Sequence, residues 1–193
     1  MNTNVTSHTL LFRALDNKDP QAWEQFIERY SHYIFKLLVN LGIKVDLEDV
    51  AQEIMLVLWK KLDTYDCKRS KFRTWMASVV RLTAMNSIRK RSRKDKLISN
   101  DDTDSINSFP DEKSYLSYAE DEWKTFIVNR ALENIRDEFR GKAIEVFEFS
   151  LTGASVDDIC QKLDLTTSTV YTLKKRVKKR LMQEVYFLQK DMG

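Results

Sequence analysis

The stretch from Phe72 to Lys96, FRTWMASVVRLTAMNSIRKRSRKDK, joins an apolar, aromatic pattern to a dense basic tail. Four apolar residues follow the i, i+3, i+4, i+7 spacing of one helix face: Phe72, Trp75, Met76 and Val79. No Gly or Pro interrupts the run, so its cations lie on or just beyond the same helix: Arg89, Lys90, Arg91, Arg93, Lys94 and Lys96. Phosphates bind such clusters with release of counterions, and neighbouring aromatic faces can hold unstacked bases. We interpret the stretch as a site where DNA is bound and opened; the alternative is an ordinary apolar core followed by a solvated helix end.

Two carboxylates lie one helical turn apart in the preceding segment, DLEDVAQEIMLVLWKKL, for which we predict a helix from Asp46 to Leu62. We expect Asp46 to cap this helix, with Asp49 at the capping-box position. Asp49 and Glu53 would then share the side opposite the apolar residues. Three uses of that side remain open: a metal site for hydrolysis, for which a third ligand is missing, a solvated acidic face, or a face that docks a partner.

The last third of the chain has the pattern of a helix-turn-helix. Ser155 and Asp158 form a capping box at the start of a short helix, a brief turn follows at Asp164, and Thr166 or Thr167 caps a long final helix. The second helix of this motif enters the major groove of DNA with its N-terminal residues near base edges. The residues placed to reach bases or phosphates are Thr167, Ser168, Tyr171, Thr172, Lys175 and Arg176, while Lys174, Lys178 and Lys179 would meet the backbone. A solvent-facing amphipathic hairpin is the alternative.

Composition predicts an all-α protein made of two helical domains. The 193 residues include 4 Gly and 2 Pro, which leaves little material for hairpins, and 42% of the residues are hydrophobic, which is enough for packed cores. The net charge of +3 conceals segregation, because six of the seven residues from 174 to 180 are cationic whereas residues 99–122 hold eight acids and one Lys. We therefore predict a domain over residues 1–97, a flexible acidic linker over 98–122, and a helix-turn-helix domain over 123–193.

We expect a soluble, cytoplasmic protein without a metal or other cofactor. Cys67 and Cys160 lie far apart and form neither a disulfide framework nor a metal-ligand cluster. His32 has no second ligand at metal spacing. The N-terminus lacks a signal-peptide pattern, and no apolar run approaches the length of a membrane span.

The two motifs together, an acidic-faced helix followed by the aromatic and basic stretch, then an acidic segment and STVYTLKKRVKKRL, resemble the extracytoplasmic-function (ECF) sigma factors of the sigma-70 family. The resemblance extends from about Leu10 to Leu188. It implies a non-enzymatic subunit that directs bacterial core RNA polymerase to promoter DNA and assists promoter melting. An anti-sigma factor is a further partner that the resemblance implies.

The resemblance also implies roles for individual residues. Asp49, Gln52 and Glu53 would dock on a coiled coil of the largest polymerase subunit. The minus-10 promoter element would be recognised and melted by Phe72, Trp75, Asn86, Arg89, Lys90, Arg91 and Arg93. The minus-35 element would be read by Thr167, Ser168, Tyr171, Thr172, Lys174, Lys175, Arg176 and Lys178.

Two other functions remain open on the sequence alone. A stand-alone helix-turn-helix regulator would account for the last third of the chain but not for the acidic helix and the stretch after it. A metal-dependent nuclease would use Asp46, Asp49 and Glu53. The sequence shows no His or Cys set and no Gly-rich phosphate loop to accompany those acids.

Overall fold

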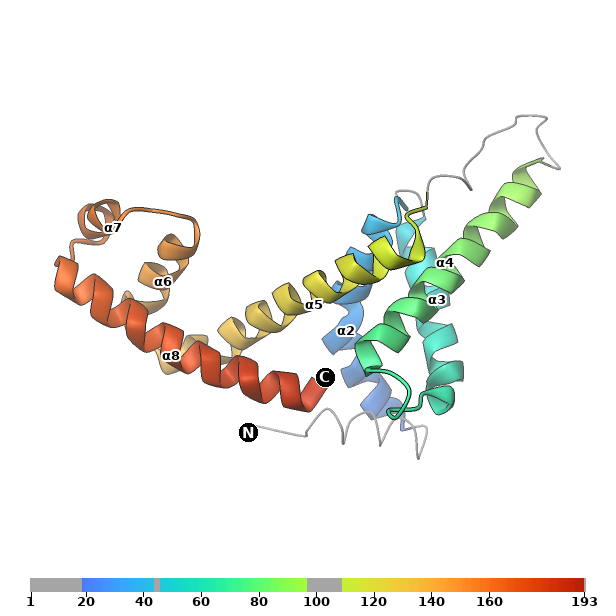
Figure 1. Cartoon of the computed structure of the whole chain (residues 1–193), viewed down its shortest axis with the longest axis horizontal. Coiled ribbons are helices and arrows are strands. Elements are labelled where there is room, and N and C mark those ends of the chain that lie inside the picture. Colours follow the sequence, from blue (N-terminus) through green and yellow to red (C-terminus); the bar gives the residue numbers. More distant parts are fainter. Residues whose placement is uncertain (1–18, 44–45, 97–108, 193) are drawn as a thin grey trace. The chain divides into compact units, whose positions relative to one another are not determined.

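A computed structural model describes residues 19–43, 46–96 and 109–192, with the backbone alone given at 92–96 and 191–192. Throughout these ranges the regular structure is helical, without strands, so the predicted all-α class is confirmed. The chain divides after Lys124 into two compact units (Figure 1). Residues 98–108 of the predicted linker lie outside the described residues.

The first unit is built from α2 (Pro20–Asn40), α3 (Leu47–Lys61), the short 3₁₀ turn η1 (Leu62–Thr64) and α4 (Phe72–Lys96), which pack on one another (Figure 1). Asp19 caps α2 by accepting a hydrogen bond from the Gln21 amide at 3.0 Å, and Pro20 occupies the first turn, where its missing N–H costs nothing. Gly42 follows the helix in the left-handed conformation, as expected for a helix end. Side chains at helical spacing form the buried core, among them Phe26, Tyr30, Ile34, Leu58 and Met76.

Helix α5 (Glu112–Ile135) corrects the predicted linker, because residues 112–122 are helical. Asp111 accepts hydrogen bonds from the amide and hydroxyl of Ser114 at 3.0 and 2.6 Å and so starts the helix. Tyr115, Ala119 and Trp123 recur every fourth residue and are buried in the first unit. This apolar stripe is narrow, and the acidic residues around it gave the segment the composition of a linker.

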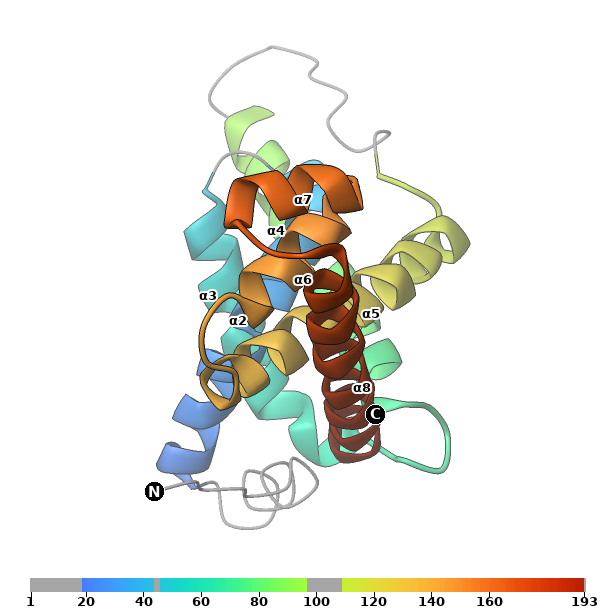
Figure 2. The ribbon, with the colours of Figure 1, turned by 90° about the vertical axis from the view of Figure 1, so that its left-hand side faces the viewer.

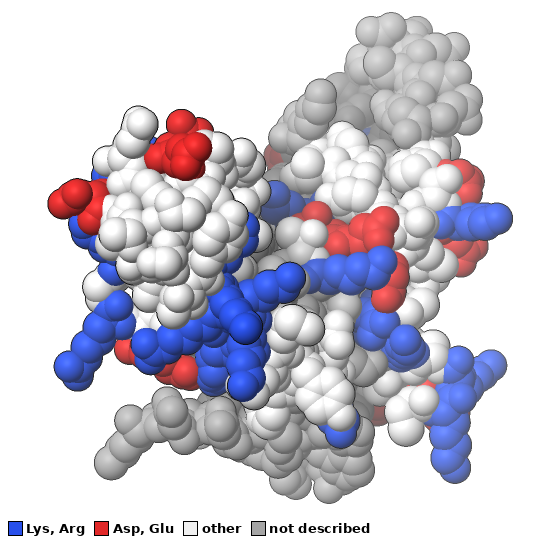
Figure 3. Space-filling model, turned by 60° about the vertical axis from the view of Figure 1, so that its left-hand side comes forward, with Lys and Arg blue, Asp and Glu red and all other residues white. Residues whose placement is uncertain are grey.

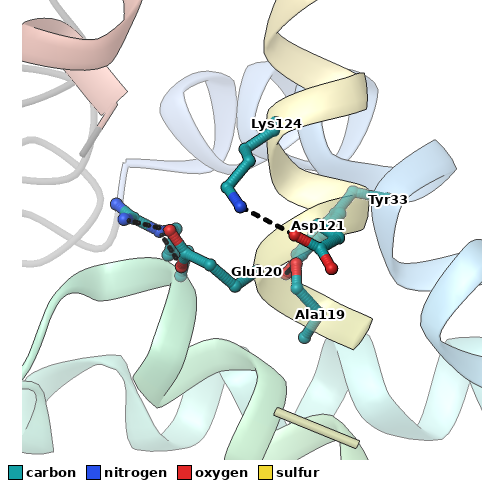
Figure 4. A network of polar contacts seen from close by, with 6 residues as sticks. Tyr33, Ala119, Glu120, Asp121 and Lys124 are labelled. Atoms are coloured by element: carbon teal, nitrogen blue, oxygen red, sulfur yellow. Dashed lines mark hydrogen bonds and ion pairs between the residues drawn. The ribbon is translucent and has the colours of Figure 1, made fainter. Parts of the chain in front are cut away.

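Polar contacts hold the first half of α5 to α2 and α4. The Tyr33 hydroxyl donates to the Ala119 carbonyl at 3.0 Å, and the Arg73 guanidinium forms a bidentate ion pair with Glu120 at 2.7 and 2.8 Å. Figure 4 shows Tyr33 beside Ala119 and the Glu120 carboxylate turned toward its partner. The ion pair holds the pKa of Glu120 below its usual range, chiefly through the hydrogen bonds from Arg73. Residues 112–124 are therefore part of the first unit rather than a connector.

The second unit contains the rest of α5, the 3₁₀ turn η2 (Arg136–Glu138), α6 (Ala143–Leu151), α7 (Val156–Leu163) and α8 (Thr167–Met192) (Figure 2). Val146, Ile159, Leu163 and Val170 form the core that joins α6, α7 and the start of α8. Arg180 of α8 binds Glu138 through two hydrogen bonds of 2.6 and 2.7 Å, and Asn134 of α5 donates to Glu184 at 2.9 Å. These contacts fix the long α8 against the end of α5.

No described helix combines the length and the apolar character that crossing a membrane requires.

Candidate nucleic-acid and partner interfaces

Helix α4 carries the aromatic residues predicted to meet DNA, and the structure separates them. Phe72 is 2% exposed and packs against Phe26, Tyr30 and Tyr65, with ring centroids 5.2 to 5.9 Å apart. The Phe72 ring therefore completes the core of the first unit and is not exposed in this structure, and its contact with DNA stays a prediction. Trp75, one turn later, is only half-buried and lies 5.5 Å from Tyr65 across the edge of the same cluster. Trp75 is thus the aromatic residue of this pair that a base could reach.

The outer face of α4, which we define as Leu82, Asn86, Arg89 and Lys90, continues from Trp75 at helical spacing. All four side chains are exposed. The structure therefore brings together Asn86 and two of the predicted cations. Leu82 is 55% exposed and was missed by the sequence interpretation, although its place four residues before Asn86 is a signal that could have identified it. The Arg93 side chain lies outside the described part of the chain.

The acid face of α3, defined as Asp49, Gln52 and Glu53, is exposed as predicted. Leu56 extends this face by one turn and is itself an exposed apolar side chain. An exposed Leu bordered by carboxylates is typical of a surface that binds another protein, where apolar contact provides area and charge provides orientation.

Asp46 does not cap α3, which corrects the prediction of a capping box. Its backbone adopts the left-handed conformation with φ 55° and ψ 32°, and its side chain makes no capping hydrogen bond. Instead the carboxylate accepts a hydrogen bond from Arg91 of α4 at 2.5 Å, and the same guanidinium lies 4.0 Å from Asp49. A left-handed Asp costs about 1–2 kcal/mol relative to the right-handed conformation. In this conformation the Asp46 carboxylate pairs with Arg91, and the ion pair joins the acid face of α3 to the basic end of α4.

Among the described residues, no three His, Cys, Asp or Glu side chains come close enough to hold a metal ion. The acids Asp46, Asp49 and Glu53 do not form such a group.

In the second unit, α7 and α8 have the local geometry that the helix-turn-helix pattern predicts. Ser155 and Asp158 form the expected capping box, with the Asp158 amide donating to the Ser155 hydroxyl at 3.1 Å and the Ser155 amide donating back to Asp158 at 3.2 Å. The Ser155 hydroxyl also donates to the Asp158 carboxylate at 2.6 Å, and this bond, followed by the one from the Ser155 amide, lowers the pKa of Asp158. Asp164 turns the chain in the left-handed conformation, and Thr166 starts α8 by accepting from the Thr169 amide at 3.3 Å. The turn between the two helices is therefore short and capped on both sides.

The start of α8 presents a polar and cationic surface. Of the residues predicted to read the minus-35 element, Lys174 is half-buried and the others are exposed: Thr167, Ser168, Tyr171, Thr172, Lys175, Arg176 and Lys178. The Arg176 guanidinium lies 5.4 Å from the Phe139 ring centroid, which holds this side chain at the surface. Figure 3, with Lys and Arg in blue, shows cations of this unit gathered into a patch rather than spread evenly. The arrangement suits a polyanion, whose phosphates take several cations at once.

Comparison with known proteins identifies the first unit. Residues 25–94 match the family described as sigma-70 region 2. The chain carries a sigma-70 region 2 domain. This match confirms the resemblance to the sigma-70 family over the part of the chain that contains the acid face and the outer face of α4.

A curated relative matches part of the chain. The ECF RNA polymerase sigma factor RpoE of Cereibacter sphaeroides is 25% identical over 87 residues, which are 44% of this chain and 48% of that protein. The aligned stretch thus spans about half the length of the curated relative. A solved structure of CnrH in complex with the cytosolic domain of CnrY overlaps 92% of this chain and 95% of that one, with 17% identity and a TM-score of 0.37.

Proposed function

We propose that this protein is an RNA polymerase sigma factor of the ECF group, which directs core polymerase to promoters and helps to open them. The observation that carries the proposal is the region 2 domain, in which one small helical unit exposes both an acidic face and an aromatic and cationic face. The curated relative that matches nearly half of the chain is itself an ECF sigma factor.

The acid face of α3 is the proposed polymerase contact. Asp49, Gln52 and Glu53 would meet the coiled coil of the largest polymerase subunit, with the exposed Leu56 beside them. Carboxylates at the edge of an apolar contact act mainly on orientation and association rate, so loss of their charge weakens binding without unfolding the domain. None of these side chains belongs to the buried core, which makes them suitable for testing by charge reversal.

The outer face of α4 is the proposed minus-10 contact. Arg89 and Lys90 would neutralise phosphates, and Trp75 and Asn86 would receive an unstacked base. Base unstacking costs a few kcal/mol, and aromatic stacking offsets about 1–3 kcal/mol per base. The protein would therefore open the duplex by capturing bases and would perform no covalent chemistry.

The exposed N-terminal half of α8 is the proposed minus-35 contact. Thr167, Ser168, Tyr171 and Thr172 would meet base edges, because the N-terminal residues of a recognition helix do so. Lys175 and Arg176 follow them on the exposed surface. Loss of a phosphate contact lowers the slope of log affinity against log salt concentration by about one. Loss of a base contact instead reduces the preference for the correct base by roughly 1–3 kcal/mol. Substituting Lys175 and Arg176 by Ala therefore separates the two kinds of contact.

Size-exclusion chromatography of the full-length protein mixed with bacterial core RNA polymerase tests the proposal. We expect the wild type to co-elute with the polymerase, and Asp49→Arg and Glu53→Lys to reduce the bound fraction. Glu24→Lys is the matched control, because Glu24 is an exposed carboxylate on α2, a different helix from the one that carries the acid face. Wild-type protein that elutes separately, while retarding duplex DNA by itself, would contradict the proposal and favour a stand-alone helix-turn-helix regulator, a function that the exposed face of α8 would also serve.

Three features of the proposal stay predictions, the first from the family resemblance alone and the other two from the sequence pattern as well. They are an anti-sigma partner, a cytoplasmic location, and the absence of enzymatic activity and of a cofactor. An anti-sigma protein would be expected to cover the acid face of α3, because that would block polymerase binding directly.

A further inference from the structure

Arg91 connects two surfaces to which the proposed function gives different partners. Its guanidinium is bound to Asp46 at 2.5 Å and lies 4.0 Å from Asp49. Asp49 belongs to the acid face proposed for polymerase, whereas Arg91 belongs to the cations predicted to meet DNA phosphates. The Arg91–Asp49 ion pair therefore involves one residue from each surface.

The position of Arg91 on α4 differs from that of the other cations. Arg89 and Lys90 are exposed on the outer face, but Arg91 follows the buried Ala84 and Ser87 along the buried side of the helix. Its side chain is 37% exposed, and those of Asp46 and Asp49 are 51% and 71% exposed. The pair is thus accessible to solvent and to an incoming partner. Exposed ion pairs contribute little and exchange readily for other contacts.

We propose that Asp46 and Asp49 hold Arg91 away from nucleic acid in the free protein, and that a cationic partner bound to the acid face releases it. The inference rests on the proposed function, because it takes the partner of Asp49 to be the polymerase. A partner cation that binds Asp49 removes part of the negative charge that holds Arg91. The guanidinium then becomes available to a phosphate.

The coupling has a definite sign and is reciprocal. Release of Arg91 adds one phosphate contact, so polymerase binding raises affinity for DNA, and DNA raises affinity for polymerase by the same factor. Asp46 is the positioning residue in this scheme, since it makes the shorter contact and lies outside the set proposed to dock. Asp46→Asn is the appropriate substitution, because Asn accepts the left-handed conformation while losing the charge.

The first experiment uses the full-length free protein and a fluorescent single-stranded oligodeoxynucleotide, with binding followed by anisotropy at several salt concentrations. We expect Asp46→Asn to raise affinity for the oligonucleotide about two- to fivefold, the range that exposed ion pairs span. The slope of log affinity against log salt concentration should also steepen by about 0.7, the value for one phosphate on a single strand. The gain should disappear when Arg91→Ala is combined with Asp46→Asn. Circular dichroism of each variant checks that the helices remain folded.

Glu48→Gln is the matched control, because Glu48 is exposed in the first turn of α3 and does not contact Arg91. The substitution removes one negative charge, as Asp46→Asn does. A general reduction in repulsion would raise affinity equally in Glu48→Gln and Asp46→Asn and would persist in the Arg91→Ala background. Either result would overturn the proposal.

The second experiment repeats the comparison in the polymerase complex. If polymerase already releases Arg91, the affinity of Asp46→Asn for the oligonucleotide should exceed that of the wild type by less than about twofold. A difference of that size corresponds to the weakest exposed ion pairs. An advantage that stays the same size in the complex would overturn the release step. Failure of the wild type to co-elute with polymerase would instead contradict the proposed function, so the two failures are distinguishable.

Discussion

Tyr33 and Tyr115 are two buried tyrosines of the first unit that differ in hydrogen bonding. The Tyr33 hydroxyl donates to the Ala119 carbonyl at 3.0 Å, whereas the buried Tyr115 hydroxyl has no partner within the described structure. A made hydrogen bond contributes about 1 kcal/mol, and an unsatisfied buried hydroxyl costs about 1–3 kcal/mol. We therefore expect Tyr33→Phe to lower the free energy of unfolding by about 1 kcal/mol and Tyr115→Phe to leave it unchanged or raise it.

Urea denaturation of the two variants measures this difference, and each serves as the other's control because both lose one hydroxyl. Burial also raises the pKa of both tyrosines well above the usual range. Equal destabilisation by the two substitutions would show that the Tyr115 hydroxyl has a partner in solution.

The Arg73–Glu120 pair makes the stability of the first unit depend on pH. The pKa of Glu120 is depressed in the folded state by hydrogen bonds from Arg73, so the pair stabilises the protein fully above the unfolded pKa, near 4.5, and less as pH falls through the folded value. Arg73 is 11% exposed but Glu120 is 42% exposed, so solvent screens the pair. We expect Glu120→Gln to cost about 0.5–1 kcal/mol at pH 7.

This cost should remain constant from pH 7 to about pH 5 and shrink at lower pH, where the wild-type carboxyl also takes up a proton. Chemical denaturation across this range measures it, with Asp121→Asn as the control. Asp121 is on the same helix and forms an ion pair with Lys124 of that helix at 2.7 Å (Figure 4). A Glu120→Gln cost that is independent of pH would contradict the assigned pKa depression.

At the scale of elements, the capping box at the start of α7 stabilises the helix that precedes the turn into α8. The reciprocal bonds between Ser155 and Asp158 satisfy amides that would otherwise lack partners at the helix start. We expect Ser155→Ala to lower the free energy of unfolding by about 1 kcal/mol, and Ser155→Asp, which retains a capping oxygen, to lower it less. Hydrogen exchange of the α7 amides locates the effect. Equal losses in both variants would indicate that capping does not stabilise this helix.

Apolar periodicity allowed most of the elements to be predicted. The helices expected for α3, α4, α7 and α8, and the capping residues Ser155 and Thr166, agree with the structure. The acid face of α3 and the exposed residues of α8 could be predicted for the same reason. Periodicity also placed Phe72 and Trp75 on one face, but it cannot show which of the two lies deeper, because that depends on rings of α2 that arrive from another part of the chain.

Local sequence patterns misled the prediction at two places where tertiary contacts decide the structure. Asp46 resembles an N-cap, yet Arg91 lies 45 residues away in sequence and takes its carboxylate. Residues 112–122 resemble a linker, yet the Tyr115, Ala119 and Trp123 stripe finds a surface on α2 and α4. Neither partner could be identified from the local sequence, since both contacts join segments that meet only in the folded chain.

At the scale of the whole molecule, the first unit extends beyond the matched region 2 domain. The match ends at residue 94, but Tyr115, Ala119 and Trp123 of α5 are buried in the same unit, and Arg81 of α4 donates to the Pro110 carbonyl at 3.1 Å. Trp123 also stacks on Tyr30 with ring centroids 6.1 Å apart. A fragment that ends at the family boundary therefore exposes a large aromatic surface of α2.

We expect a fragment of residues 1–124 to unfold cooperatively. A fragment of residues 1–108 should be less stable by roughly 3–6 kcal/mol, because it loses the free energy gained by burying Tyr115, Trp123 and their neighbours. Thermal and urea denaturation of both fragments measure the difference, and binding of a hydrophobic dye reports the exposed surface. A fragment of residues 1–124 with Trp123→Ala is the control, since it keeps the helix but removes the ring that stacks on Tyr30. It should fall between the other two. Equal stability of the fragments ending at 108 and 124 would show that the first half of α5 does not belong to the first unit in solution.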